Sequence, residues 1–301
     1  MQRLSLIPYI GGKHYVIPKL IELMPKHTTY VELFGGSAKL LLNKKPSTVE
    51  VYNDLDNYLF FIFKAVSDRD IYKRIYKYFK NSIISRSLYL YHKNLIKNHF
   101  PKDIVNEYVK LKQENPDFIA ELAFAIIYNI KYSFKKTPNI TKGHFGYNVS
   151  NTGGIDIPFT IQLKRLYLIH KRLSRVIIEC DDYKKIIDRY DTPNTFFFVD
   201  PPYIGLDYYN HNFTLEQHLE MLDKLKKVKG KVLIIHNDNE VYDNHLLNNG
   251  HFKKFTFENL KFSKVKNRII SEKKYSKYKE AIYINYDLDK QLEKHEKGLF
   301  Q

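Results

Sequence analysis

The chain has 301 residues, of which 44% are hydrophobic, so it is long enough for one large domain with a smaller inserted or appended one. Its formal charge of +16 indicates a polyanionic partner such as nucleic acid, although a lysine-rich composition can also come from an AT-rich genome. Without a signal peptide, a disulfide pair or an apolar stretch of the roughly 20 residues that span a bilayer, the sequence predicts a cytoplasmic protein that is not embedded in a membrane.

The first predicted unit is a strand, a turn and a helix. Residues 29–37 (TYVELFGGS) predict a strand that runs into a glycine turn, and residues 38–44 have helical character. A second strand is predicted at 49–52, followed by an apolar helix at 56–66 with an acid near its start. This order of elements predicts parallel strand pairing in an α/β sheet.

Residues 67–154 differ in composition from the segments on either side. The first part favours helices rich in lysine and tyrosine, 120–130 resembles a buried helix, and about 129–160 is polar with several glycines, which predicts a loop or hairpin. Strand patterns then resume at 175–179, 196–199, 231–236 and 280–285. We therefore expect one α/β domain, formed by 1–66 and 155–301, that is interrupted by an inserted domain at 67–154.

The strand at 196–199 ends in the most informative motif of the chain, Asp200-Pro201-Pro202-Tyr203. Prolines end the strand ladder and fix the following turn. Asp200 and Tyr203 are therefore expected at the carboxyl edge of the sheet, where open α/β folds bind ligands. A carboxylate beside an aromatic ring suits an amino group on a flat base.

Further motifs could meet at the same edge. Two glycine pairs, in segments 9–15 (YIGGKHY) and 32–38 (ELFGGSA), allow a backbone to approach a ligand closely, but neither completes a phosphate-binding or dinucleotide fingerprint. Asp54 follows the second strand, roughly 20 residues after the glycine turn, where doubly wound folds bind ribose hydroxyls. Either Asp54 or Asp56 could instead cap the following helix.

Together these motifs resemble the N6-adenine DNA methyltransferases of the Dam type. That family has the same order of a Gly-Gly-Lys segment, a glycine turn, an acid after the second strand, a DNA-recognition insertion and Asp-Pro-Pro-Tyr. The resemblance covers nearly the full length and implies a Rossmann-like mixed sheet of the class I methyltransferase type with an inserted, mainly helical DNA-recognition domain. It also implies duplex DNA as substrate, S-adenosylmethionine as methyl donor and S-adenosylhomocysteine as product, in a bacterium or a phage-infected host.

The resemblance also implies roles for individual residues around the cofactor. Asp54 would bind the ribose of the cofactor, and Asp200 would contact both the cofactor and the target base. Asp182 and Tyr183 would contact the adenine of the cofactor, although this pair could equally be an exposed turn. The remaining residues implied for the cofactor pocket are Tyr9, Lys13, Phe34, Gly35, Gly36 and Ser37.

The catalytic loop suits methylation of an exocyclic amine, whose lone pair is delocalised into the ring. Asp200 and the carbonyl of Pro201 could accept both amine hydrogens and aim the nitrogen at the methyl group. Pro202 would help to fix the turn, and Tyr203 could stack on a base flipped out of the duplex. We expect no metal, because the histidines do not fall at metal-ligand spacing, and we expect His236 to be a polar strand terminus.

The insertion departs from the family pattern, because only Phe145-Gly146 is retained from a hairpin that in relatives carries Asn, Arg and Gly. We therefore expect a DNA target different from, or looser than, the family's best-known one. The candidate DNA contacts are Lys131, Lys135, Lys136 and Lys142 for phosphates and Asn139, Asn148 and Asn151 for base edges.

Two other functions are compatible with the sequence. An Asp/Asn-Pro-Pro-Tyr loop also occurs in RNA base N-methyltransferases, but the basic, aromatic insertion favours DNA. A catalytically silent nucleic-acid-binding module would explain the charge, yet Lys13, Asp54, Asp200 and Tyr203 are all intact. We expect a monomer, and the sequence does not distinguish a restriction-modification, phage or orphan context.

Overall fold

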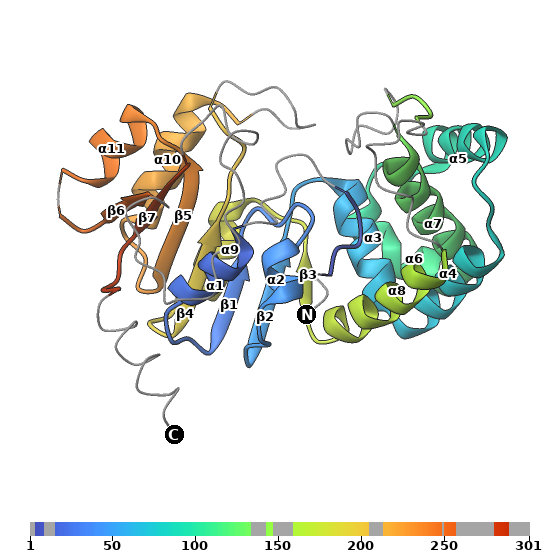
Figure 1. The fold of residues 1–301 in the computed structure, drawn as a ribbon, viewed down its shortest axis with the longest axis horizontal. Coiled ribbons are helices and arrows are strands. Elements are labelled where there is room, and N and C mark those ends of the chain that lie inside the picture. Colours follow the sequence, from blue (N-terminus) through green and yellow to red (C-terminus); the bar gives the residue numbers. More distant parts are fainter. Residues whose placement is uncertain are drawn as a thin grey trace.

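The computed structural model describes residues 4–8, 16–133, 143–146, 159–204, 213–248, 250–256 and 280–288. Within these ranges the chain forms a sheet covered by helices, with a group of helices beside it (Figure 1). The strands of the sheet are β1 (Thr29–Glu32), β2 (Val49–Asn53), β3 (Ile177–Glu179), β4 (Thr195–Val199), β5 (Lys231–Asn237), β6 (Lys253–Thr256) and β7 (Glu280–Ile284).

The strand order is β3-β2-β1-β4-β5-β7-β6. The first five strands are parallel, whereas β7 is antiparallel to both β5 and β6. The chain passes outward from β1 to β3 on one side and from β4 to β5 on the other, so the topological switch point lies between β1 and β4. This mixed sheet confirms the fold class that the sequence predicts.

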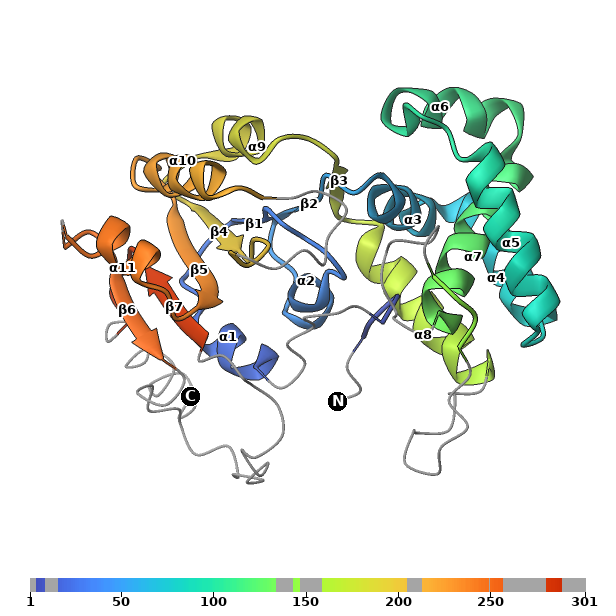
Figure 2. The same ribbon diagram turned by 90° about the horizontal axis from the view of Figure 1, so that it is seen from above.

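Strand β4 shows why the sequence forms a buried sheet. All five of its residues are buried, with Phe196 and Phe198 in one hydrophobic cluster and Phe197 and Val199 in the other. A strand covered on both faces needs such a continuous apolar run. Figure 2 shows α9 (Tyr183–Tyr190) and α10 (Leu215–Leu225) on one side of the sheet and α1 (Ile17–Leu23) and α2 (Lys39–Asn43) on the other.

The helices beside the sheet are centred on α7, which is buried along most of its length. Side chains that accept hydrogen bonds from the first turn cap α3 to α7, as expected for Asp, Ser and Asn at helix starts. The full group of helices beside the sheet consists of α3 (Asn57–Ser67), α4 (Arg69–Asn81), α5 (Arg86–His99), α6 (Ile104–Glu114), α7 (Pro116–Tyr132) and α8 (Phe159–Leu173). In the part of the chain that the structure describes, no helix is both long and apolar enough to cross a membrane.

The helical group does not coincide with the expected insertion at 67–154. Helix α8 lies outside that range, and α3 lies before it except for its last residue, Ser67. Both pack against helices inside the range, and their buried side chains belong to the same hydrophobic cluster as one face of the sheet. The boundaries of the domains stay a prediction. The expected loop at 129–160 is corrected at both ends, since α7 continues to Tyr132 and α8 begins at Phe159.

Several elements were not expected from the sequence, and two of them illustrate why. Strand β6 carries KKFT, which has no alternating apolar pattern and pairs with the buried strand β7. The other is α11 (Glu240–Leu246), a short helix that Asn239 caps. Both depend on contacts with distant parts of the chain, which local patterns do not reveal.

Candidate active site

The turn after β1 requires glycine at its first position. A Cβ on Gly35 would lie 2.2 Å from a ring carbon of Tyr52, so a larger residue does not fit. The Tyr52 hydroxyl donates to the carbonyl of Gly36 at 2.8 Å, and the Gly35 amide donates to the carbonyl of Asn53 at 2.8 Å. Gly36 has a φ of 50°, a value that glycine adopts easily. The glycine turn is therefore held against the end of β2.

Two acids follow β2, and the structure separates their roles. Asp56 caps α3 by accepting from the amides of Tyr58 and Leu59. Asp54 instead accepts from the Gly36 amide at 2.7 Å and from the Asp56 amide at 2.9 Å. Burial, reinforced by the charge of Asp56, raises the pKa of Asp54 to about 7. The sequence left the capping residue open; the structure assigns capping to Asp56 and brings Asp54 to the glycine turn.

Asn53 joins three strand ends and was missed by the sequence analysis. Its side-chain amide donates to the carbonyls of Leu33 and Asp181, both at 3.0 Å, and its oxygen accepts from the Asp181 amide at 2.9 Å. The residue is 1% exposed. The sequence feature that could have revealed Asn53 is an asparagine at the end of an apolar strand. Its partner Asp181, however, lies 128 residues away in the sequence.

An aromatic wall adjoins this edge. The ring of Phe34, which follows β1, lies 5.8 Å from Tyr183 and 5.5 Å from Phe213, and Tyr183 lies 5.9 Å from Phe213. Asp182 caps α9 by accepting from the Lys184 amide. The structure thus brings together two predicted cofactor residues, Phe34 and Tyr183. It adds Phe213, which lies just before α10 and which the sequence analysis did not name.

The Asp-Pro-Pro-Tyr loop leaves β4 beside the glycine turn. Glu32 at the end of β1 pairs in register with Phe198, two residues before Asp200. Pro201 is buried, whereas Asp200, Pro202 and Tyr203 are partly exposed. The predicted catalytic loop and the predicted cofactor turn therefore meet at adjacent strand ends (Figure 1).

Glu32 is a buried acid that the sequence analysis did not single out. It is 2% exposed and accepts from the Tyr30 hydroxyl at 2.8 Å and the Leu41 amide at 3.1 Å. Burial raises its pKa to about 8, and the charge of Asp200 contributes in the same direction. The sequence feature that could have revealed Glu32 is an acid at the end of an apolar strand, three residues before Gly35.

Tyr203 is held by two residues from neighbouring strands. Its ring lies 4.6 Å from that of His236, and its hydroxyl donates to Glu280 at 3.5 Å. His236 also accepts from the Ile204 amide at 3.4 Å and is fully buried. The expectation of a polar strand terminus therefore understates this histidine, which contacts the catalytic loop.

The candidate DNA contacts are only partly described. Lys131 lies in the last turn of α7 rather than in a loop, with its ammonium group 4.9 Å from the centre of the Tyr132 ring. The retained Phe145-Gly146 pair packs on the helices, because Phe145 lies 5.5 Å from Tyr89 and the Gly146 amide donates to the Tyr132 carbonyl. The other candidates lie outside the described residues, as do two of the cofactor positions: Tyr9, Lys13, Lys135, Lys136, Asn139, Lys142, Asn148 and Asn151.

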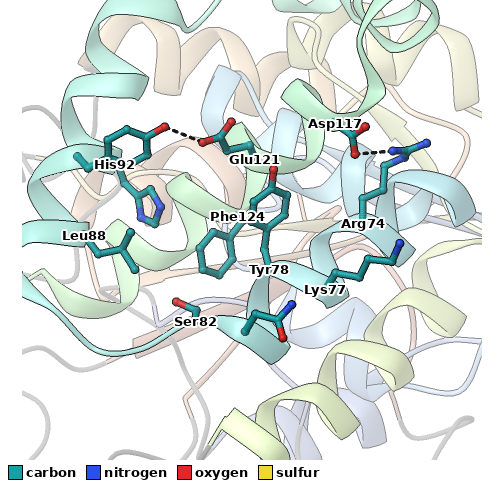
Figure 3. A pocket seen from close by; sticks show the side chains of 11 residues that line it. Arg74, Lys77, Tyr78, Ser82, Leu88, His92, Asp117, Glu121 and Phe124 are labelled. Atoms are coloured by element: carbon teal, nitrogen blue, oxygen red, sulfur yellow. Dashed lines mark hydrogen bonds and ion pairs between the residues drawn. The ribbon is translucent and has the colours of Figure 1, made fainter.

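A separate groove of about 490 Å³ lies among α4, α5 and α7. Figure 3 shows Arg74 paired with Asp117 across it, and Tyr91 donates to Glu121 at 2.9 Å. The groove therefore mixes both signs of charge, unlike the basic surface that favours a DNA backbone. Among the described residues, no cluster of three or more His, Cys, Asp or Glu side chains is arranged to hold a metal ion.

Comparison with known proteins places this geometry in a family. The model of the D12 class N6 adenine-specific DNA methyltransferases matches residues 9–266, which include the glycine turn and the Asp-Pro-Pro-Tyr loop. The chain is also 23% identical over 242 residues to the Type II methyltransferase M.CviBI of Paramecium bursaria Chlorella virus NC1A, an alignment that covers 76% of this chain and 81% of the relative. With the match spanning most of its length and both halves of the site, the chain belongs to the D12 class of N6 adenine-specific DNA methyltransferases.

Proposed function

We propose that the protein methylates N6 of an adenine flipped out of duplex DNA through the loop formed by residues 200–203. The observation that carries this proposal is the adjacency of β1 and β4, whose carboxyl ends hold the glycine turn and Asp200. A methyl donor bound at the turn and an amine bound at the loop would face each other across this switch point.

The residues at the turn fit S-adenosylmethionine, which supplies the methyl group when bound. Gly35 and Gly36 leave room for close approach, and the carboxyl of Asp54 lies at the turn. The rings of Phe34 and Tyr183 offer an apolar wall suited to a flat base. We assign Asp54 to the ribose, and we assign Phe34, Ser37, Asp182 and Tyr183, with Tyr9 and Lys13, to the rest of the cofactor site.

The catalytic step requires the adenine amine to act as a nucleophile. Asp200 and the carbonyl of Pro201 would each accept one amine hydrogen, which draws the nitrogen lone pair out of the ring and orients it. Extrusion of the base costs a few kcal/mol. Stacking on Tyr203 would return about 1–3 kcal/mol of that cost.

The proposed partner contacts follow from the charge. A formal charge of +16 favours a phosphate backbone, and Lys131, Lys135, Lys136 and Lys142 are proposed as phosphate contacts. Asn139 and Asn148 are proposed to read base edges. We propose a cytoplasmic, monomeric enzyme that uses no metal and has a target other than the family's best-known site; a methylation map that returns that site would contradict the target proposal.

The test is analysis of the methylated product. The protein is incubated with labelled S-adenosylmethionine and with unmethylated duplex DNA or structured RNA in competition, and the nucleic acids are then digested to nucleosides. Label in N6-methyldeoxyadenosine alone is the expected result. Label in RNA would indicate an RNA base methyltransferase, and binding of nucleic acid without binding of the cofactor would indicate a silent module.

A further inference from the structure

His236 lies behind the catalytic loop rather than inside it. It is the penultimate residue of β5, pairs in register with Ala281 of β7, and is fully buried. Its ring contacts that of Tyr203 at 4.6 Å with an interplanar angle of 47°. It therefore touches the proposed base-stacking residue from the side of the sheet.

The hydrogen bonds of His236 determine its tautomer. The Ile204 amide can only donate, so Nε2, 3.4 Å away, must accept and carries no proton. The proton then belongs on Nδ1, which lies 3.0 Å from the carbonyl oxygen of Asn237 and can donate to it. In this arrangement the imidazole is neutral, and each nitrogen has a backbone partner.

A second layer of side chains fixes the His236 ring. Tyr242 of α11 stacks on it at 4.2 Å with an interplanar angle of 15°. The Tyr242 hydroxyl lies 2.7 Å from Nδ1 of His218, and both residues are fully buried. Since buried rings packed in this way have little freedom to move, the His236 and Tyr242 rings form a rigid support behind the catalytic loop.

We infer that His236 is a positioning residue for methyl transfer. Through Nε2 it holds the backbone that follows Tyr203, and through its ring it limits where the Tyr203 ring can lie. With the Tyr203 hydroxyl bonded to Glu280 at 3.5 Å, both ends of that side chain are constrained. The inference rests on the proposed function, because the position of Tyr203 matters only if a base stacks on it near Asp200.

Three substitutions separate the contacts of His236. His236→Gln places an amide oxygen near the position of Nε2 and keeps an acceptor for Ile204 without the ring. His236→Phe keeps a ring without the acceptor, and His236→Asn is too short to supply either. The matched control is His92→Asn, which removes another buried histidine, 3% exposed, from the helices beside the sheet.

The measured quantities are kcat and KM on unmethylated plasmid DNA, the Kd of S-adenosylmethionine and the folded fraction by circular dichroism. Because displacement of a reacting group by about 1 Å can cost about 100-fold in rate, kcat should fall by about 10- to 100-fold in His236→Asn. His236→Gln and His236→Phe should each lose less than His236→Asn. The Kd of the cofactor, the KM and the folded fraction should stay within about 2-fold of the wild type, and His92→Asn should retain kcat.

Three results would each overturn the inference. The first is a kcat of His236→Asn within about 2-fold of the wild type. The second is a loss of kcat that follows the folded fraction or the cofactor Kd, and the third is an equal loss of kcat in all three variants. Wild-type protein that transfers no methyl group to DNA would instead refute the proposed function, so the two failures are distinguishable.

Discussion

Glu50, near the amino end of β2, joins that strand to Lys44 after α2 and to Arg172 of α8, and it offers a prediction with a defined magnitude. Its side chain is 2% exposed, pairs with Lys44 and Arg172, and accepts from the Ser47 amide at 3.0 Å. Arg172 of α8 also donates to the carbonyl of Leu41 in α2 at 2.8 Å. Burial opposes ionisation of Glu50, but the hydrogen bonds from Arg172 and Lys44 outweigh it and lower its pKa.

Replacement of Glu50 by Gln keeps the shape of the side chain but removes its charge. Lys44, whose side chain is 2% exposed, and Arg172, 10% exposed, would then lack their buried counter-ion. Loss of one partner from a buried pair costs about 3–5 kcal/mol, and Arg172 cannot relieve this by losing its proton. At roughly 2–4 °C per kcal/mol for a domain of this size class, Tm should fall on the order of 10 °C.

The assay is thermal unfolding followed by circular dichroism at neutral pH. The control is Glu220→Gln, because Glu220 pairs with Lys184 on the surface, where the two side chains are 54% and 40% exposed. Such pairs contribute about 0–1 kcal/mol. If Glu50→Gln lowers Tm no more than Glu220→Gln does, the buried cluster does not stabilise the fold as argued.

Three further predictions concern the site and its support. Asp54→Ala should weaken cofactor binding by about 10-fold or more in calorimetry, whereas Asp56→Ala should cost about 1 kcal/mol of stability with little change in affinity; equal loss of affinity would contradict their separate roles. His92 and His218 have pKa values lowered by burial to about 4. Between pH 6.5 and 4 the unfolded chain therefore binds more protons than the folded chain. The free energy of unfolding should fall on acidification by up to roughly 3 kcal/mol per histidine. If a variant with Asn at both positions loses as much stability across this interval as the wild type does in urea unfolding, the argument is refuted. Tyr203→Ala should lower methyl transfer most on intact duplex and least on mismatched DNA, and equal loss on both would exclude the stacking role.

Local sequence patterns were sufficient to predict β4 and the turn that follows it. The apolar run of β4 and the prolines after it predicted a buried strand followed by a turn that holds an acid and a ring at the carboxyl edge of the sheet, because both features depend on neighbouring residues. The glycine turn was predicted for the same reason. The collision that makes glycine necessary at Gly35, however, involves Tyr52 of the adjacent strand.

Two residues whose roles the sequence analysis missed or understated, Asn53 and His236, act through distant partners. Asn53 bonds to Asp181, and His236 accepts from the amide of Ile204 in a different strand connection. The choice between Asp54 and Asp56 as helix cap likewise depends on where the Gly36 amide lies. Since side-chain periodicity carries no information on such pairings, only the folded chain could assign these roles.

The most direct test of the account is the single-turnover rate of methyl transfer from S-adenosylmethionine to unmethylated duplex DNA in the wild type and in Asp200→Ala. Cofactor affinity is measured in parallel to separate chemistry from binding. We predict transfer to adenine N6 by the wild type and, in the variant at saturating S-adenosylmethionine, a rate lower by about 100-fold or more, as expected for loss of a group that stabilises the transition state. A variant that transfers methyl groups at the wild-type rate would contradict the role of the Asp-Pro-Pro-Tyr loop.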